Sequence, residues 1–270
     1  MTGKCVILLL LISSSVYAQN KKGTVYATWG WNRSLYTNSG IHFVGDNYDF
    51  TVKDVEARDR QSPINAETYV NPANLTIPQT NLKIGYFFKD NWSVTANIDH
   101  MKYVMVQDQT VQIDGSISGT GTEYDGVYDH EPIVLTKDFL TYEHTNGLNY
   151  VNVELNRHWN IANVESIHMQ INPLVGAGLG FLYPKTAVDL IDNELADEFH
   201  LAGYGLALKV GLNIVIWKYF YLQTELKEGF INMPDVRTTN DPSDIAKQHF
   251  FFTQFNFGLG FCIPLFPADE

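Results

Sequence analysis

Residues Phe255–Ile263 read Phe-Asn-Phe-Gly-Leu-Gly-Phe-Cys-Ile, and this stretch decides the fold class. Its odd-numbered positions are large and apolar, whereas its even-numbered positions are small or polar. A β-strand sends successive side chains to opposite faces, so one face of this strand is apolar and the other tolerates polar surroundings. The length of the alternation matches the roughly 9–11 residues that a tilted strand needs to cross a bilayer. The stretch therefore predicts a membrane-spanning strand.

Seven earlier segments alternate in the same way, which gives eight predicted strands in all. The connections between them alternate between short (about 89–91, 160–165 and 217–218) and long (about 37–80, 107–147, 184–200 and 233–247). Short turns on one side and long loops on the other are typical of bacterial outer-membrane barrels. The predicted fold is thus all-β, a closed antiparallel eight-stranded transmembrane β-barrel with long extracellular loops. Where the alternation loses its phase, near His100–Lys102, we expect a β-bulge.

The N-terminus has the pattern of a secretory signal peptide, predicted to span residues 1–18. Lys4 precedes the apolar run Cys5–Ile12, and Val16 and Ala18 occupy the small-residue positions before the expected cleavage site. Residues 19–270 then form one barrel domain, with the bacterial outer membrane as the expected location. Cys262 is the one cysteine left in this domain, which excludes an intramolecular disulfide and a CxxC site. We expect it to be a buried filler.

The net charge of −12 is unevenly distributed along the chain. The four long loops carry 22 acidic and 7 basic residues, so the acidity gathers at one end of the predicted barrel. An acidic surface disfavours nucleic acid as a partner. The expected partners are outer-membrane lipid, lipopolysaccharide and the barrel-assembly machinery. No cofactor is expected, apart from divalent cations bound weakly at the acidic loops.

The predicted register turns six charged side chains toward the barrel interior, namely Lys83, Asp99, Glu154, Lys209, Glu225 and Lys227. Three are acids and three are bases, so they can neutralise one another. The interior of an eight-stranded barrel is only wide enough for side chains. We therefore expect a plugged lumen, because unpaired charges there would be costly. A path for protons or ions through the lumen is the functional alternative.

Two polar clusters in the long loops are candidate binding surfaces. The first loop supplies Asp46, Asp49, Asp54, Asp59 and Arg60, and the third supplies Asp197 and His200. Apolar residues interleave with the first cluster, which indicates a folded loop, with strands that continue above the membrane as one form of it. Clustered carboxylates suit calcium, but the spacing is not that of an EF-hand, so no specific metal site is predicted.

An enzyme is the disfavoured alternative from another functional class. Barrel enzymes that modify lipids need a nucleophile within reach of a base at the outer rim. His144 beside Glu143, and His200 with Asp197, are the candidate bases, yet the sequence contains no GxSxG motif. The expected function is that of an integral outer-membrane protein with a structural or binding role. The alternatives are a rim-located lipid-modifying hydrolase or acyltransferase, and a narrow pore for small or apolar solutes.

Four sequence segments resemble those of known proteins. They are residues 42–60 (HFVGDNYDFTVKDVEARDR), 134–157 (VLTKDFLTYEHTNGLNYVNVELNR), 197–205 (DEFHLAGYG) and 230–239 (FINMPDVRTT). They resemble a group of uncharacterised outer-membrane β-barrel proteins of Bacteroidota-type bacteria. The resemblance covers most of the chain after residue 18, and it implies the barrel fold and the outer-membrane location. It implies no activity and no catalytic residue.

Overall fold

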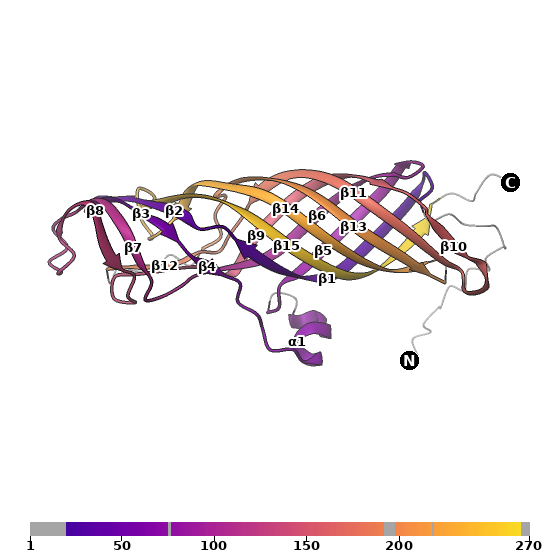
Figure 1. The fold of residues 1–270 in the computed structure, drawn as a ribbon, viewed down its shortest axis with the longest axis horizontal. Coiled ribbons are helices and arrows are strands. Elements are labelled where there is room, and N and C mark those ends of the chain that lie inside the picture. The colour runs from indigo at the N-terminus through magenta and orange to yellow at the C-terminus, as the bar shows by residue number, and fades with distance from the viewer. Residues whose placement is uncertain (1–19, 75–76, 192–197, 218, 266–270) are drawn as a thin grey trace, which may run out of the picture.

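The computed structural model describes residues 20–74, 77–191, 198–217 and 219–265, which form one elongated β structure (Figure 1). The predicted signal peptide and Asp197 lie outside the described residues. Within the described ranges, no helix combines the length and the apolar character that a membrane span requires.

Eight strands pair antiparallel in a ring, and the first strand pairs with the last. Their order is β1-β5-β6-β9-β11-β13-β14-β15, and β1 lies against β15 from Thr24 opposite Pro264 to Tyr36 opposite Phe252. The ring strands are β1 (Thr24–Tyr36), β5 (Thr80–Lys89), β6 (Trp92–Met105), β9 (Leu140–His158), β11 (Met169–Leu182), β13 (Gly203–Ile216), β14 (Phe220–Arg237) and β15 (Ile245–Pro264). These correspond one to one with the eight predicted strands.

The predicted long loops contain several strands, which corrects the sequence-based boundaries. They contain β2 (Ser39–Gly45), β3 (Tyr48–Val55), β4 (Ala57–Arg58), β7 (Thr110–Ile117), β8 (Gly126–Val134) and β12 (Ala187–Leu190). β2, β3, β7 and β8 follow β15 in the sheet, while β4 pairs with β6 and β12 with β9. Together with the adjoining ends of β6, β9, β14 and β15, these strands form what we call the outer extension, at the end of the molecule opposite the β10 hairpin (Figure 1).

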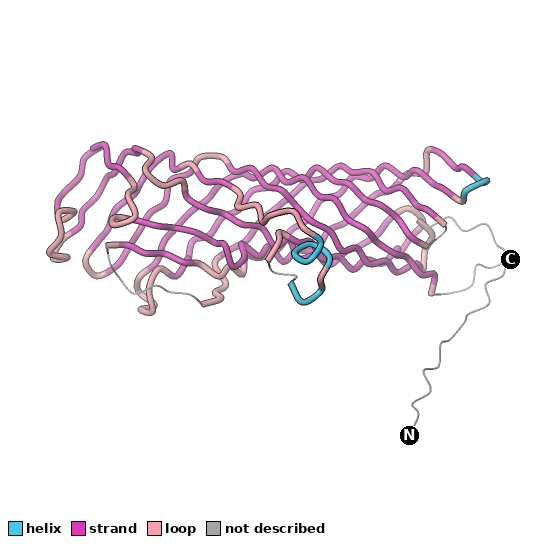
Figure 2. The backbone as a smooth tube through the Cα atoms, turned by 90° about the horizontal axis from the view of Figure 1, so that it is seen from below, coloured by secondary structure: helices cyan, strands magenta, loops and turns pink. Residues whose placement is uncertain are grey.

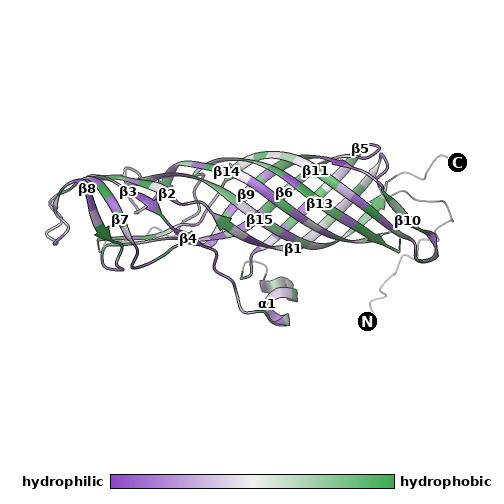
Figure 3. Ribbon diagram, in the orientation of Figure 1, coloured by the Kyte–Doolittle hydropathy of each residue, from purple (hydrophilic) through white to green (hydrophobic). Residues whose placement is uncertain are grey.

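The ring and the outer extension have opposite polarity. On the ring, apolar and polar residues alternate along the strands, as the hydropathy colouring shows (Figure 3), and the apolar side chains are exposed. We call this surface the apolar belt; its exposed residues include Leu82, Ile84, Val94, Ile98, Val153, Leu155, Val175, Leu179, Leu206, Leu208, Val210, Leu226, Phe255, Leu259 and Phe261. In the outer extension the apolar residues point inward and form a buried core, which includes Phe43, Phe50, Ile113, Phe139 and Tyr142.

The inner face changes from polar to apolar within single strands. In β6 the charged Asp99 and the apolar Met101 both face the interior and are fully buried. The pairing of β6 with β9 shifts register between Met101 and Tyr103, which confirms the predicted bulge. The strands of the long loops were missed because their apolar residues point into a buried core, the reverse of the outward pattern that identified the ring strands.

Four short elements complete the fold: α1 (Ala66–Val70), the 3-10 helix η1 (Pro72–Asn74), β10 (Ala162–Val164) and the 3-10 helix η2 (Glu165–Ile167). β10 pairs with the start of β11, so the predicted short link 160–165 is a small hairpin instead of a simple turn. α1 lies outside the strands in Figure 1, and the view from below shows it in front of the middle of the ring (Figure 2).

Candidate functional site

The six inward charged side chains form one continuous chain of ion pairs inside the ring. Its order is Lys83, Glu225, Lys209, Glu154, Lys227 and Asp99, so that bases and acids alternate. Lys209 Nζ lies 2.7 Å from Glu225 Oε1 and 2.6 Å from Glu154 Oε2. Lys227 Nζ lies 2.7 Å from both Glu154 Oε1 and Asp99 Oδ2. All six residues are buried, and each interior lysine contacts at least one carboxylate.

Neutral amide side chains donate further hydrogen bonds to two of the three carboxylates, Asp99 and Glu225. Asn81, Asn97 and Asn152 donate to the Asp99 carboxylate, and Gln223 Nε2 donates to Glu225 Oε1 at 2.7 Å. A buried carboxylate is stabilised only when its lone pairs are used in this way. Two cavities adjoin this region, one on either side of Gln223, and each has a volume of about 10 Å³. That volume suits a single water molecule.

An apolar layer covers the ion-pair chain on the side of the outer extension. It consists of fully buried side chains that point into the barrel: Met101, Leu148, Leu182, Phe250 and Phe252. Tyr103 stacks on Phe250 with ring centroids 5.1 Å apart, so this layer continues into the core of the outer extension. An ion that passed through the barrel would have to cross both layers, and the apolar one offers it no hydration.

The loop residues proposed as binding candidates have different partners and do not converge on one site. Asp49 Oδ1 lies 2.7 Å from His42 Nε2 at the β2–β3 hairpin, whereas Asp46 lies in its turn and Asp54 has a positive φ of 55°. Near β4, Asp59 accepts a hydrogen bond from the Ser34 amide and Arg60 pairs with Glu143 at 2.9 Å. His200 pairs with Asp235 at 2.8 Å.

His144 and Glu143 point to opposite faces of β9 and form no catalytic pair. His144 is fully buried, its Nδ1 lies 2.8 Å from Thr186 Oγ1, and its ring packs against Tyr103 and Tyr142. Burial lowers the pKa of the His144 imidazole to about 3. Glu143, by contrast, is occupied by Arg60. A substrate at the outer rim would not reach His144.

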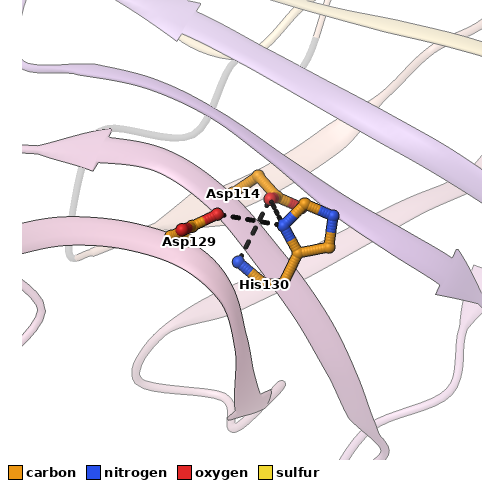
Figure 4. Close-up of side chains that lie close together, drawn as sticks. All are labelled: Asp114, Asp129 and His130. Carbon is orange, nitrogen blue, oxygen red and sulfur yellow. Dashed lines mark hydrogen bonds and ion pairs between the residues drawn. The ribbon is translucent and has the colours of Figure 1, made fainter.

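A cluster of Asp114, Asp129 and His130 on the β7–β8 hairpin is the one group of potential metal ligands found among the described residues (Figure 4). His130 Nδ1 lies 2.6 Å from Asp114 Oδ1 and 3.1 Å from Asp129 Oδ1. Lys53 Nζ lies 2.7 Å from Asp114 Oδ2, so a cation already compensates this carboxylate. The sequence could not indicate the cluster, because only the pairing of β7 with β8 brings its members together.

Comparisons with known proteins give loose structural likenesses to bacterial outer-membrane proteins. The chain is similar to outer membrane protein AlkL, studied by solid-state NMR in DMPC bilayers (12% identity, 97% of this chain and 100% of that chain covered, TM-score 0.40). It is also similar to outer membrane protein OprG of Pseudomonas aeruginosa (12% identity, 91% and 98% covered, TM-score 0.37) and to the attachment invasion locus protein Ail of Yersinia pestis (11%, 90% and 99%, TM-score 0.31).

No family model and no curated protein matches the chain. Since the structural superpositions are this loose, the assignment of a closed eight-stranded ring stands on the strand pairing of the chain itself.

Proposed function

We propose that this protein is an integral outer-membrane β-barrel that conducts no ions and serves a structural or binding role through its outer extension. One observation supports the proposal most strongly. The closed ring has apolar residues on its outer surface, and the charged side chains in its interior form ion pairs with one another. Such an exterior suits lipid, and a closed ring leaves no unpaired strand edge in the hydrocarbon.

The orientation follows from the connections and the termini. The short turns at Asp90–Asn91 and around Trp217 lie at the end of the ring that carries both Thr24 and Pro264. We place this end in the periplasm and the outer extension outside the cell, as in other bacterial barrels. Arg157 lies over the rings of Trp92 and Trp159 at this end, at 5.3 and 5.7 Å from their centroids. Aromatic residues gather at the interfaces of membrane barrels.

Binding through the outer extension is favoured over catalysis. The acidic residues gather in the segments that form this extension, and its interior is a packed apolar core. A stably folded, negatively charged surface suits a cationic partner or a layer of divalent cations that bridges it to the phosphates of lipopolysaccharide. Lipid modification finds less support, because His144 is enclosed and His200 pairs with Asp235.

The test is single-channel recording of the refolded protein in planar bilayers. Folding is first verified by the shift in electrophoretic mobility between heated and unheated samples, and a general porin serves as the conducting control. We expect insertion without stable openings. Large, persistent openings would contradict the closed interior, and failure to associate with vesicles or detergent micelles would contradict the membrane assignment.

A further inference from the structure

Residues 61–74 and 77–79, which we call the lateral segment, leave the outer extension after β4 and return to the ring at β5. The segment contains α1, which lies beside the middle of the barrel and far from the β8 end (Figures 1 and 2). Glu67 is its single charged residue, whereas the preceding residues 46–60 include eight charged side chains. The low charge distinguishes the lateral segment from the rest of the outer loops.

Contacts to β1 fix the lateral segment at the height of the apolar belt. The ring of Tyr69 lies 6.1 Å from that of Trp31, and Arg33 Nη2 donates a hydrogen bond of 2.9 Å to Tyr69 Oη. Trp31 points outward from the ring and stacks on Phe257 of β15, with centroids 6.5 Å apart. Whatever surrounds Trp31 and Phe257 must therefore also surround α1.

Several polar groups of the lateral segment bond to one another. Ser62 Oγ donates to the Ile77 carbonyl at 2.8 Å, and Tyr69 Oη donates to the Ser62 carbonyl at 3.0 Å. Asn65 Oδ1 accepts from the Thr68 amide at 2.8 Å, which caps the start of α1. Backbone outside helices and barrels is tolerated near hydrocarbon only when its polar groups are satisfied in this manner.

Among the described residues of the lateral segment, three large apolar side chains are exposed. Ile64 is 81% exposed, Val70 is 60% exposed and Ile77 is 47% exposed. We propose that the lateral segment is embedded in the outer leaflet of the membrane, at the boundary between headgroups and acyl chains, with these three side chains in contact with lipid. This inference rests on the proposed membrane function. Its occupant is the lipid surface, because the contact is continuous with the apolar belt and the segment carries one charged residue, Glu67.

The experiment measures the environment of single nitroxide spin labels by electron paramagnetic resonance. Labels are placed through Ile64→Cys and Val70→Cys in a chain in which Cys5 and Cys262 are replaced by alanine, refolded into phosphatidylcholine vesicles. Leu208→Cys on the apolar belt is the lipid control (67% exposed), and Val127→Cys in β8 is the water control (83% exposed). All four positions are exposed in the protein alone, so differences between them report the surroundings.

We expect labels at positions 64 and 70 to resemble the label at 208, with higher collision rates with oxygen than with a water-soluble nickel chelate. Labels at 64 and 70 that behave like the label at 127, while 208 contacts lipid, would overturn this inference alone. A label at 208 that favours the nickel chelate would overturn the proposed membrane function and this inference with it. The heated and unheated mobility of each variant verifies that it folds.

Discussion

Lys227 Nζ lies 2.7 Å from Asp99 Oδ2, although 128 positions separate the two residues in the chain. The contact joins β14 to β6 across the lumen, since β9, β11 and β13 lie between these strands in the ring. Lys227 also contacts Glu154, so one ammonium group compensates two buried carboxylates.

The first prediction concerns Lys227→Met, which would leave these carboxylates short of one cation in the interior. Removing one partner of a buried ion pair is costly, and we expect the free energy of unfolding to fall by about 3–5 kcal/mol. Urea unfolding of the detergent-refolded protein, followed by tryptophan fluorescence, measures this change.

The matched control for this prediction is Lys21→Met, because Lys21 pairs with Asp90 at 2.9 Å on the exposed surface. An exposed pair contributes little, so we expect a change below about 1 kcal/mol. Equal effects of the two substitutions would show that the interior chain of ion pairs gives no special stability.

A second prediction concerns the close approach of β1 and β15, where Gly30 lies opposite Gly258. A Cβ atom on Gly258 would lie 2.8 Å from Thr28 Cγ2 and 3.2 Å from the Trp29 carbonyl oxygen. We therefore expect Gly258→Ala to lower the free energy of unfolding by about 1–3 kcal/mol. Gly40→Ala is the control, since its nearest neighbour would be 3.8 Å away. Unchanged urea unfolding of Gly258→Ala would contradict the register.

The third prediction concerns pH and the buried His144 in the outer extension. Its pKa in the folded protein is about 3, below the ordinary value of 6.5, so the unfolded chain binds the proton more readily. The stability that this group contributes is complete above pH 6.5 and is lost as the pH falls toward 3. Between pH 7 and pH 5 we expect a loss of about 2 kcal/mol from this group.

The variant His144→Phe tests this directly, because it keeps an aromatic ring in the core and removes the titrating group. Urea unfolding at pH 7 and at pH 5 should show a smaller loss for the variant than for the unaltered protein. The same loss in both proteins would mean that His144 is not the source of the acid sensitivity.

The fourth prediction concerns Lys53, whose ammonium group lies beside Asp114 in the hairpin cluster. The variant Lys53→Met would leave Asp114, Asp129 and His130 without this cation, and carboxylate and imidazole groups suit Zn²⁺. Titration calorimetry should show tighter Zn²⁺ binding by the variant than by the unaltered protein. The control adds Asp129→Asn to the Lys53→Met variant and should reverse the gain in Zn²⁺ affinity. Equal Zn²⁺ affinities of all three proteins would contradict the proposed role of Lys53 in the cluster.

The ring could be predicted from the sequence because each strand repeats one simple rule. Phe255, Leu259 and Phe261 face outward and are exposed, as their spacing indicates, while Asn256 and Cys262 are buried. The six interior charges also lie together as the register predicts, since inward positions of neighbouring strands must meet in a narrow lumen.

The outer extension could not be predicted to the same extent, because the rule reverses there. Ile41 and Phe43 are buried inside β2, whereas His42 faces outward, so the pattern matches that of a water-soluble sheet. Irregular backbone also interrupts the strands. Glu56 separates β3 from β4, and the residues around Asp108 separate β6 from β7. The contacts of His200, Asp59 and Arg60 depend on these pairings, and residue spacing alone carries no signal for them.

The reversal of polarity between Asp99 and Met101 has a consequence for biogenesis. A folded outer extension presents charged side chains to its surroundings, and such a surface cannot pass through hydrocarbon. In the proposed membrane location, its strands would therefore have to cross the bilayer before their apolar core has condensed, while the ring is still open. In the proposed membrane, insertion and the final packing of Phe250 and Phe252 would thus form one coupled step.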